Sequence, residues 1–144
     1  MIITILLVAV VVVVLLAMAG FVFWRRRPQQ LKTDYYQAQW LELQALLHNK
    51  SKWADAVLAA DSLLDTALKK KHIRGRSMGE RLVKVQRILS DNDSAWFGHK
   101  LRNRIATDPQ TKLKESEVKQ ALLGIRQALK DVGALPNGQS GSSK

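Results

Sequence analysis

The chain of 144 residues contains no cysteine. This excludes a disulfide-stapled fold, thiol catalysis and zinc sites built on cysteine. Histidine is scarce too, and no two of His48, His72 and His99 are three or four residues apart, so no zinc motif forms. The sequence therefore predicts no metal, no cofactor and no catalytic residue set of a familiar type.

Charge is missing altogether from residues 1–24, of which only Thr4 and Gly20 are not apolar. As a helix this segment spans about 36 Å, against a hydrocarbon core of about 30 Å. Ala17-Met18-Ala19 has the spacing of a signal-peptide cleavage site, but no basic region precedes the apolar run and the run continues to Trp24. We therefore predict that residues 1–24 are a transmembrane anchor.

The C-terminal flank of this anchor predicts its orientation. Trp24 is expected at headgroup depth, and Arg25, Arg26 and Arg27 are expected to meet the anionic leaflet. Because positive charge lies only on this side, we expect the N-terminus outside and the rest of the chain in the cytoplasm, at a bacterial inner membrane. Residues 25–33 then form a basic juxtamembrane linker.

The rest of the chain carries all 23 Lys and Arg and all 12 Asp and Glu. Its apolar content suffices for one small core, which excludes a multi-domain enzyme. Apolar residues recur at helical spacing, so the predicted fold is all-α, with a helical bundle domain over residues 34–135 and a disordered tail over 136–144. Five helices are expected, at about 34–48, 52–70, 77–89, 94–106 and 115–132.

Three residues are expected to mark helix ends. Ser51 is a candidate N-cap for the second bundle helix. Ser77, followed three residues later by Glu80, matches a capping box. Gly133 fits the position just after the last helix.

The densest charge lies in residues 69–87, where Glu80 is the one acidic residue. Such a segment attracts polyanions. The polyanion-binding candidates are Lys69, Lys70, Lys71, Arg74, Arg76, Arg81, Lys84 and Arg87. The anchor brings membrane lipid close to them, and aromatic residues that stack on bases are missing, so a solvated or lipid-contacting face is favoured over a nucleic-acid site.

Two carboxylates four residues apart, Asp61 and Asp65, invite a catalytic or metal-binding interpretation. No further ligands follow at a readable spacing. Lys69 stands four residues after Asp65, which favours an ion-pair stripe, or the pairing of one carboxylate with a basic residue of the fourth bundle helix.

The segment 96–106 places His99, Arg102 and Asn103 on one side of a helix. Together with 60–65 and 79–82 it resembles a group of small bacterial membrane-anchored helical proteins over residues 30–135. More distantly, Arg102-Asn103 at a helix end resembles the HEPN domain, an all-α module in which an Arg, a polar residue and a His four to six positions after the Arg cleave RNA. The His position falls on Thr107, so the resemblance implies a degenerate, non-cleaving member.

Two functions follow from the sequence. The first is a single-pass membrane-anchored interaction or scaffold module, with its basic face towards anionic lipid or an acidic partner and with a protein or a second copy docked on the bundle. The alternative is a HEPN-like RNA-binding domain that uses Arg102, Asn103 and His99. Neither predicts a small-molecule substrate.

Overall fold

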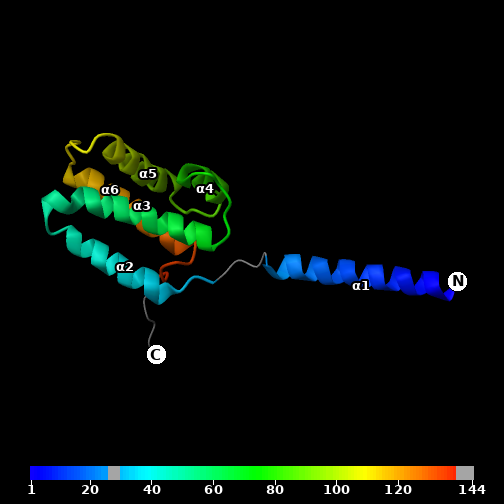
Figure 1. The fold of residues 1–144 in the computed structure, drawn as a ribbon. Helices are drawn as coiled ribbons and strands as arrows, with labels where there is room; N and C mark the ends of the chain where they lie inside the picture. The colour runs from blue at the N-terminus through cyan, green and yellow to red at the C-terminus, as the bar shows by residue number, and fades with distance from the viewer. Residues whose placement is uncertain (26–29, 139–144) are drawn as a thin grey trace, which may run out of the picture.

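The structure is a computed structural model that describes residues 1–25 and 30–138, and this part of the chain is all-α, as predicted (Figure 1). Its helices lie close to the expected positions. They are α1 (Ile2–Arg25), α2 (Thr33–Leu46), the 3₁₀ helix η1 (Lys50–Lys52), α3 (Trp53–Lys70), α4 (Met78–Val85), α5 (Asn92–Thr107) and α6 (Glu115–Asp131).

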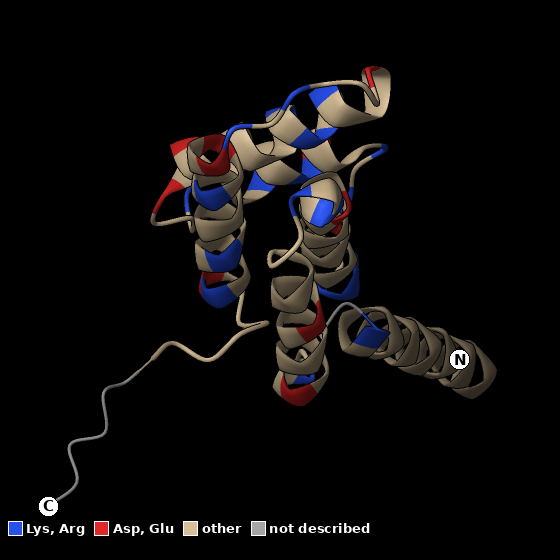
Figure 2. Ribbon diagram, turned by 90° about the vertical axis from the view of Figure 1, so that its left-hand side faces the viewer, with Lys and Arg blue, Asp and Glu red and all other residues tan. Residues whose placement is uncertain are grey.

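Helix α1 extends away from the bundle and buries none of its residues. It carries neither an acidic nor a basic residue before Arg25, as Figure 2 shows, and its most apolar window has a mean hydropathy of 3.4. By length and composition α1 is compatible with a membrane span and also with a signal sequence. Arg26 and Arg27, and residues 139–144 of the predicted tail, lie outside the described residues.

Helix α3 is the centre of the bundle, because α2, α5 and α6 all pack against it. A short turn through η1 joins α2 to α3, so the two helices run antiparallel and the start of α2 lies beside the end of α3 (Figure 1). Lys32, just before α2, and Lys70, at the end of α3, accordingly line one hollow. The end of the bundle that α1 joins is therefore the end where α3 stops.

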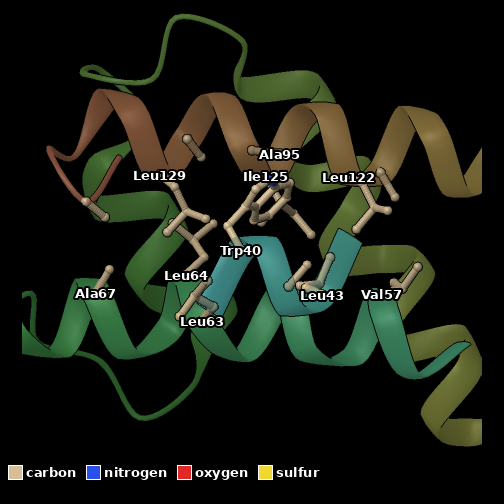
Figure 3. Close-up of a cluster of buried hydrophobic side chains, with 14 of the residues drawn as sticks. Trp40, Leu43, Val57, Leu63, Leu64, Ala67, Ala95, Leu122, Ile125 and Leu129 are labelled. Carbon is tan, nitrogen blue, oxygen red and sulfur yellow. The ribbon is translucent and has the colours of Figure 1, made fainter. Parts of the chain in front are cut away.

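Helices α2 to α6 all contribute buried residues to the core, and Figure 3 shows the part that lies between α2, α3 and α6. Trp40 reaches from α2 between the other two helices, close to Leu64 of α3 and Ile125 of α6. Its indole nitrogen is buried without a hydrogen-bond partner in the described part of the chain. Trp53 is only half-buried, and its Nε1 donates to the carbonyl of Leu47 at 3.1 Å, which closes the α2–α3 turn.

Two glycines let α5 and α6 approach closely. A Cβ built on Gly98 of α5 would lie 2.8 Å from Ile125 Cγ1, and one built on Gly124 of α6 would lie 2.3 Å from the backbone of Ser94. Real Cβ contacts are never this short, so both positions require the absence of a side chain. The helical spacing of apolar residues in the sequence does not predict this packing.

The helix ends agree in part with the predicted caps. Ser77 caps α4, since its Oγ accepts the amide N–H of Glu80 at 3.2 Å. The Glu80 carboxylate, however, accepts from the amide of Arg76 at 2.8 Å and not from the amide of Ser77. The prediction for Ser51 is wrong, because Asn49 is the residue whose side chain accepts an amide N–H there, and it caps η1.

Candidate functional site

A polar seam crosses the contact between α3 and α5. Asp61 and His99 are both buried, with 4% and 8% of their surfaces exposed, and Nδ1 of His99 lies 2.9 Å from Oδ1 of Asp61. Nε2 of the same ring lies 3.2 Å from Nδ2 of Asn103. The sequence expectation that a carboxylate of α3 pairs with a basic residue of the fourth bundle helix is thus confirmed for Asp61.

Arg102 fixes the direction of every hydrogen bond in this seam. Its guanidinium donates from Nη1 to Oδ1 of Asn103 at 3.1 Å, and arginine can only donate. The amide nitrogen of Asn103 must therefore face His99 and donate to Nε2. His99 then carries its proton on Nδ1 and donates it to Asp61.

This seam leaves no ring nitrogen of His99 free for a substrate. The ring lies edge-on to Trp96, with centroids 5.9 Å apart, and beside Gly79 at the start of α4. Arg102 contributes a longer contact, 3.7 Å from its Nε to the carboxylate of Asp61, and 41% of its side chain is exposed. Of the predicted trio, Arg102 and Asn103 reach the surface and His99 is a fixed link between two helices.

Thr107 lies one helical turn beyond Asn103 and is exposed. Its Oγ1 donates to the carbonyl of Asn103 at 2.9 Å, a local bond that a helix surface commonly makes. Asn103 and Thr107 line an open hollow of about 600 Å³ at the end of α5, together with Gln110 and Lys112.

A second cluster of polar side chains connects the end of α3 to α4 and to the loop between them. Asp65 accepts from Nε of Arg81 at 2.7 Å and pairs with Lys69, also at 2.7 Å. Burial raises the pKa of the Asp65 carboxyl, but the hydrogen bonds from Arg81 and Lys69 outweigh it, so the pKa lies below its usual value. Nη1 of Arg81 also donates to the carbonyl of Gly75, which ties the 72–77 loop to α3.

Arg81 is therefore the exception among the predicted polyanion-binding residues. It is 6% exposed and its charge is already matched by Asp65, so it does not belong to the basic surface. Lys71 is half-buried. The other candidates, Lys69, Lys70, Arg74, Arg76, Lys84 and Arg87, are exposed.

The exposed candidates do not form one flat face. Lys69 and Arg74 line a hollow beside Gly75, and Lys70 lines the separate hollow between α2 and α3 that also contains Lys32. Lys69, Lys70 and Arg74 thus place positive charge in two hollows at the end of α3, whereas Lys84 and Arg87 belong to α4 and the segment after it. The end of α3 is the end of the bundle to which the N-terminal segment connects (Figure 1).

His72 follows α3 in an unusual backbone conformation. Its φ is 59°, and it is the one non-glycine residue with positive φ in the described ranges 1–25 and 30–138. The amides of His72 and Ile73 donate to the carbonyls of Lys69 and Leu68, the hydrogen-bond pair of a Schellman helix end. Helix α6 ends with the same pair of bonds, but with Gly133 at the left-handed position, as the sequence predicts.

Comparison with protein-family models, with curated proteins and with solved structures finds no match to this chain. The described residues also contain no group of three or more acidic or histidine side chains placed to hold a metal ion. The candidate site is thus defined by its own geometry: a buried polar seam at Asp61 and His99, and a basic end around His72.

Proposed function

We propose that this protein is a single-pass membrane-anchored helical module whose basic end faces the anionic lipid surface. The proposal depends on one observation: the anchor connects to the bundle at the same end as the exposed basic residues. Lys69, Lys70 and Arg74 surround the end of α3, and the antiparallel α2–α3 pair puts this end beside the start of α2, where the anchor joins. Lys and Arg near a membrane surface each gain roughly 1 kcal/mol from anionic lipid.

The exposed apolar side chains of α1 support its role as a membrane anchor. Its apolar side chains bury nothing against the bundle, so in water they would be an aggregation hazard. A bilayer removes them from water over the full length of the helix.

Membrane anchoring is tested with the full chain carrying a C-terminal tag in a bacterial host. We expect the tagged protein to remain in the membrane fraction after alkaline extraction and to keep residues 1–24 by intact-mass measurement. Val12→Arg with Leu15→Arg should release it, because each Arg costs about 3 kcal/mol at the helix centre, whereas Val12→Leu with Leu15→Val should not. A mature N-terminus at Gly20 would show a cleaved signal sequence and overturn the proposal.

The orientation of the bundle is tested by amide hydrogen exchange on the full chain in lipid nanodiscs. We expect residues 69–76 to exchange more slowly when phosphatidylglycerol replaces part of the phosphatidylcholine. The loop at 108–114 connects α5 to α6 at the opposite end of the bundle and should not change. Equal exchange of both segments in both lipids would contradict a lipid-facing basic end.

An RNA-binding, HEPN-like role is the second candidate, and one observation favours it. Arg102 is half-exposed and bonded to Asn103, which lines the hollow at the end of α5 with Thr107. Proton transfer by a side chain at position 107 is worth about 10² to 10⁴ in rate, and threonine lacks it. The candidate therefore predicts binding without cleavage.

The test is RNA binding by the full chain in neutral nanodiscs at about 50 and 200 mM salt, where a phosphate-binding protein loses affinity steeply. If binding is saturable, Thr107→His should confer cleavage that Arg102→Ala abolishes. Weak, non-saturating binding, or an inert but folded Thr107→His variant, would remove this candidate.

A further inference from the structure

We propose that the hollow at the end of α3 is a binding site for the phosphate group of an anionic lipid headgroup. The hollow has a volume of about 660 Å³ and is lined by Lys69, His72, Ile73, Arg74 and Gly75, with Arg81 at its base and Arg25 from α1. This inference rests on the membrane anchoring proposed above, and it adds a defined site and ligand to what is otherwise a diffuse positive surface.

The walls of the hollow are held in place before any ligand arrives. Arg81 is buried and ties Asp65 of α3 to the carbonyl of Gly75 in the loop. Gly75 lies so close to α4 that a Cβ there would meet Cγ of Arg81 at 3.0 Å. Ile73 packs against the core. A preformed site binds at lower entropic cost than one that must be ordered by its ligand.

The charge of the hollow is positive after its internal ion pairs are counted. Asp65 is the acidic group bonded to these residues, and Arg81 and Lys69 share it. The side chain of Lys69 is nevertheless 59% exposed, and Arg74 is exposed with no ion pair in the described part of the chain. Lys69 and Arg74 thus present N–H donors to an anion, and arginine forms paired bonds to phosphate.

His72 supplies a second, independent indication. The left-handed conformation is unfavourable for an L-residue with a side chain, and glycine takes this position at the end of α6. At the end of α3 the residue is a histidine instead, and its side chain lines the hollow beside Lys69 and Arg74. Backbone strain of this kind is commonly retained where a side chain has a role.

The site also lies within reach of lipid headgroups. From Arg25, the last residue of α1, eight residue steps lead to Thr33 at the start of α2, and a fully extended chain covers at most about 28 Å over that length. The end of α3 is beside the start of α2. A lipid headgroup is accordingly the phosphate source that the tether holds at high local concentration.

The experiment uses the ¹⁵N-labelled full chain in phosphatidylcholine nanodiscs that contain increasing fractions of phosphatidic acid. We expect saturable shifts of the Ile73 and Gly75 amide signals. Arg74→Gln should raise the half-saturating fraction about fivefold, the effect of one charge near a membrane surface. Lys100→Gln removes the same charge from α5, away from the hollow, and should change it less than twofold.

His72→Gly separates a binding role from a structural one. We expect it to weaken the interaction while leaving thermal stability unchanged or higher, because glycine suits the left-handed position. A residue needed only for folding would lower stability instead.

Two further comparisons identify the source of the phosphate and test the proposal. In the first, inorganic phosphate is added to the protein in neutral nanodiscs. If it shifts the same amide signals, and if Arg74→Gln weakens its binding, the site is supported with a free anion as its ligand. Equal weakening by Arg74→Gln and Lys100→Gln would overturn the site and leave the diffuse basic surface intact, as would shifts that never saturate. Loss of the full chain from the membrane fraction is a separate result, which would refute the anchoring.

Discussion

The close contact between α5 and α6 at Gly124 permits a sharp test of the packing. Gly124→Ala places a Cβ 2.3 Å from the backbone of Ser94, which cannot rotate away. Overpacking of a core costs about 1–3 kcal/mol, and a clash with backbone falls at the upper end. The gain in helix propensity returns about 1 kcal/mol, so we expect a net loss of about 2 kcal/mol. For a bundle of this size that lowers the melting temperature by roughly 10 °C.

The measurement is thermal unfolding of the full chain in micelles, followed by near-ultraviolet circular dichroism, which reports on Trp40, Trp53 and Trp96 in the bundle. Gly79→Ala is the matched control. A Cβ at Gly79 would meet its nearest neighbours, His99 and Trp96, at 3.6 and 3.7 Å, an ordinary contact, so this variant should be as stable as the wild type or slightly more so. Equal melting temperatures for the two variants would refute the close approach of α5 and α6.

Three further predictions concern the polar groups. Asp61→Ala should destabilise the bundle by about 2–4 kcal/mol in urea unfolding, because it leaves the buried Nδ1–H of His99 without an acceptor. The double variant Asp61→Ala with His99→Leu should lose less free energy of unfolding than the sum of the losses in the two single variants. The pKa of Asp65 is lower in the folded state than in the unfolded state, so its ionised carboxylate stabilises the fold. This stabilisation is complete above the unfolded-state pKa of about 3.9 and is lost as the pH falls through the folded-state pKa. Melting temperatures should therefore drop below about pH 4, and they should drop less in Asp65→Asn. His72→Gly should leave the melting temperature unchanged or raise it by a few degrees, and a fall would contradict the left-handed conformation.

The sequence predicts the helices well because each carries a strong local signal. Helix α2 buries Tyr36, Trp40 and Leu43, which recur at helical spacing. This spacing, the Ser77 cap and the glycine after α6 all depend on residues within a turn or two of one another. The sequence also predicts the pairing of one α3 carboxylate with the fourth bundle helix, but it does not distinguish Asp61 from Asp65.

Arg81 shows where this reasoning failed. It lies three residues after Met78 and four before Val85, on the same side of α4 as those two buried residues, and this spacing was a usable signal. Its charge alone places it in the basic segment 69–87. An arginine on the apolar side of a helix is better interpreted as half of a buried ion pair.

Other features had no local signal. The roles of Gly98 and Gly124 depend on which faces of α5 and α6 meet, and an amphipathic stripe does not specify its partner. The strained backbone at His72 likewise follows from how α3 ends against the loop, and not from a residue that favours such a turn.

The central position of α3 also has a consequence for the order in which the chain folds. As the protein is synthesised, α2 and α3 leave the ribosome early, and the part of α3 that packs against α5 and α6 stays uncovered until those two later helices have been made. If α1 has by then inserted into the bilayer, the nascent α2–α3 hairpin waits beside a lipid surface that competes for its apolar residues. On the proposed membrane orientation, we expect the positive charge around the end of α3 to keep this hairpin at the hydrated headgroups until α5 and α6 pack against it.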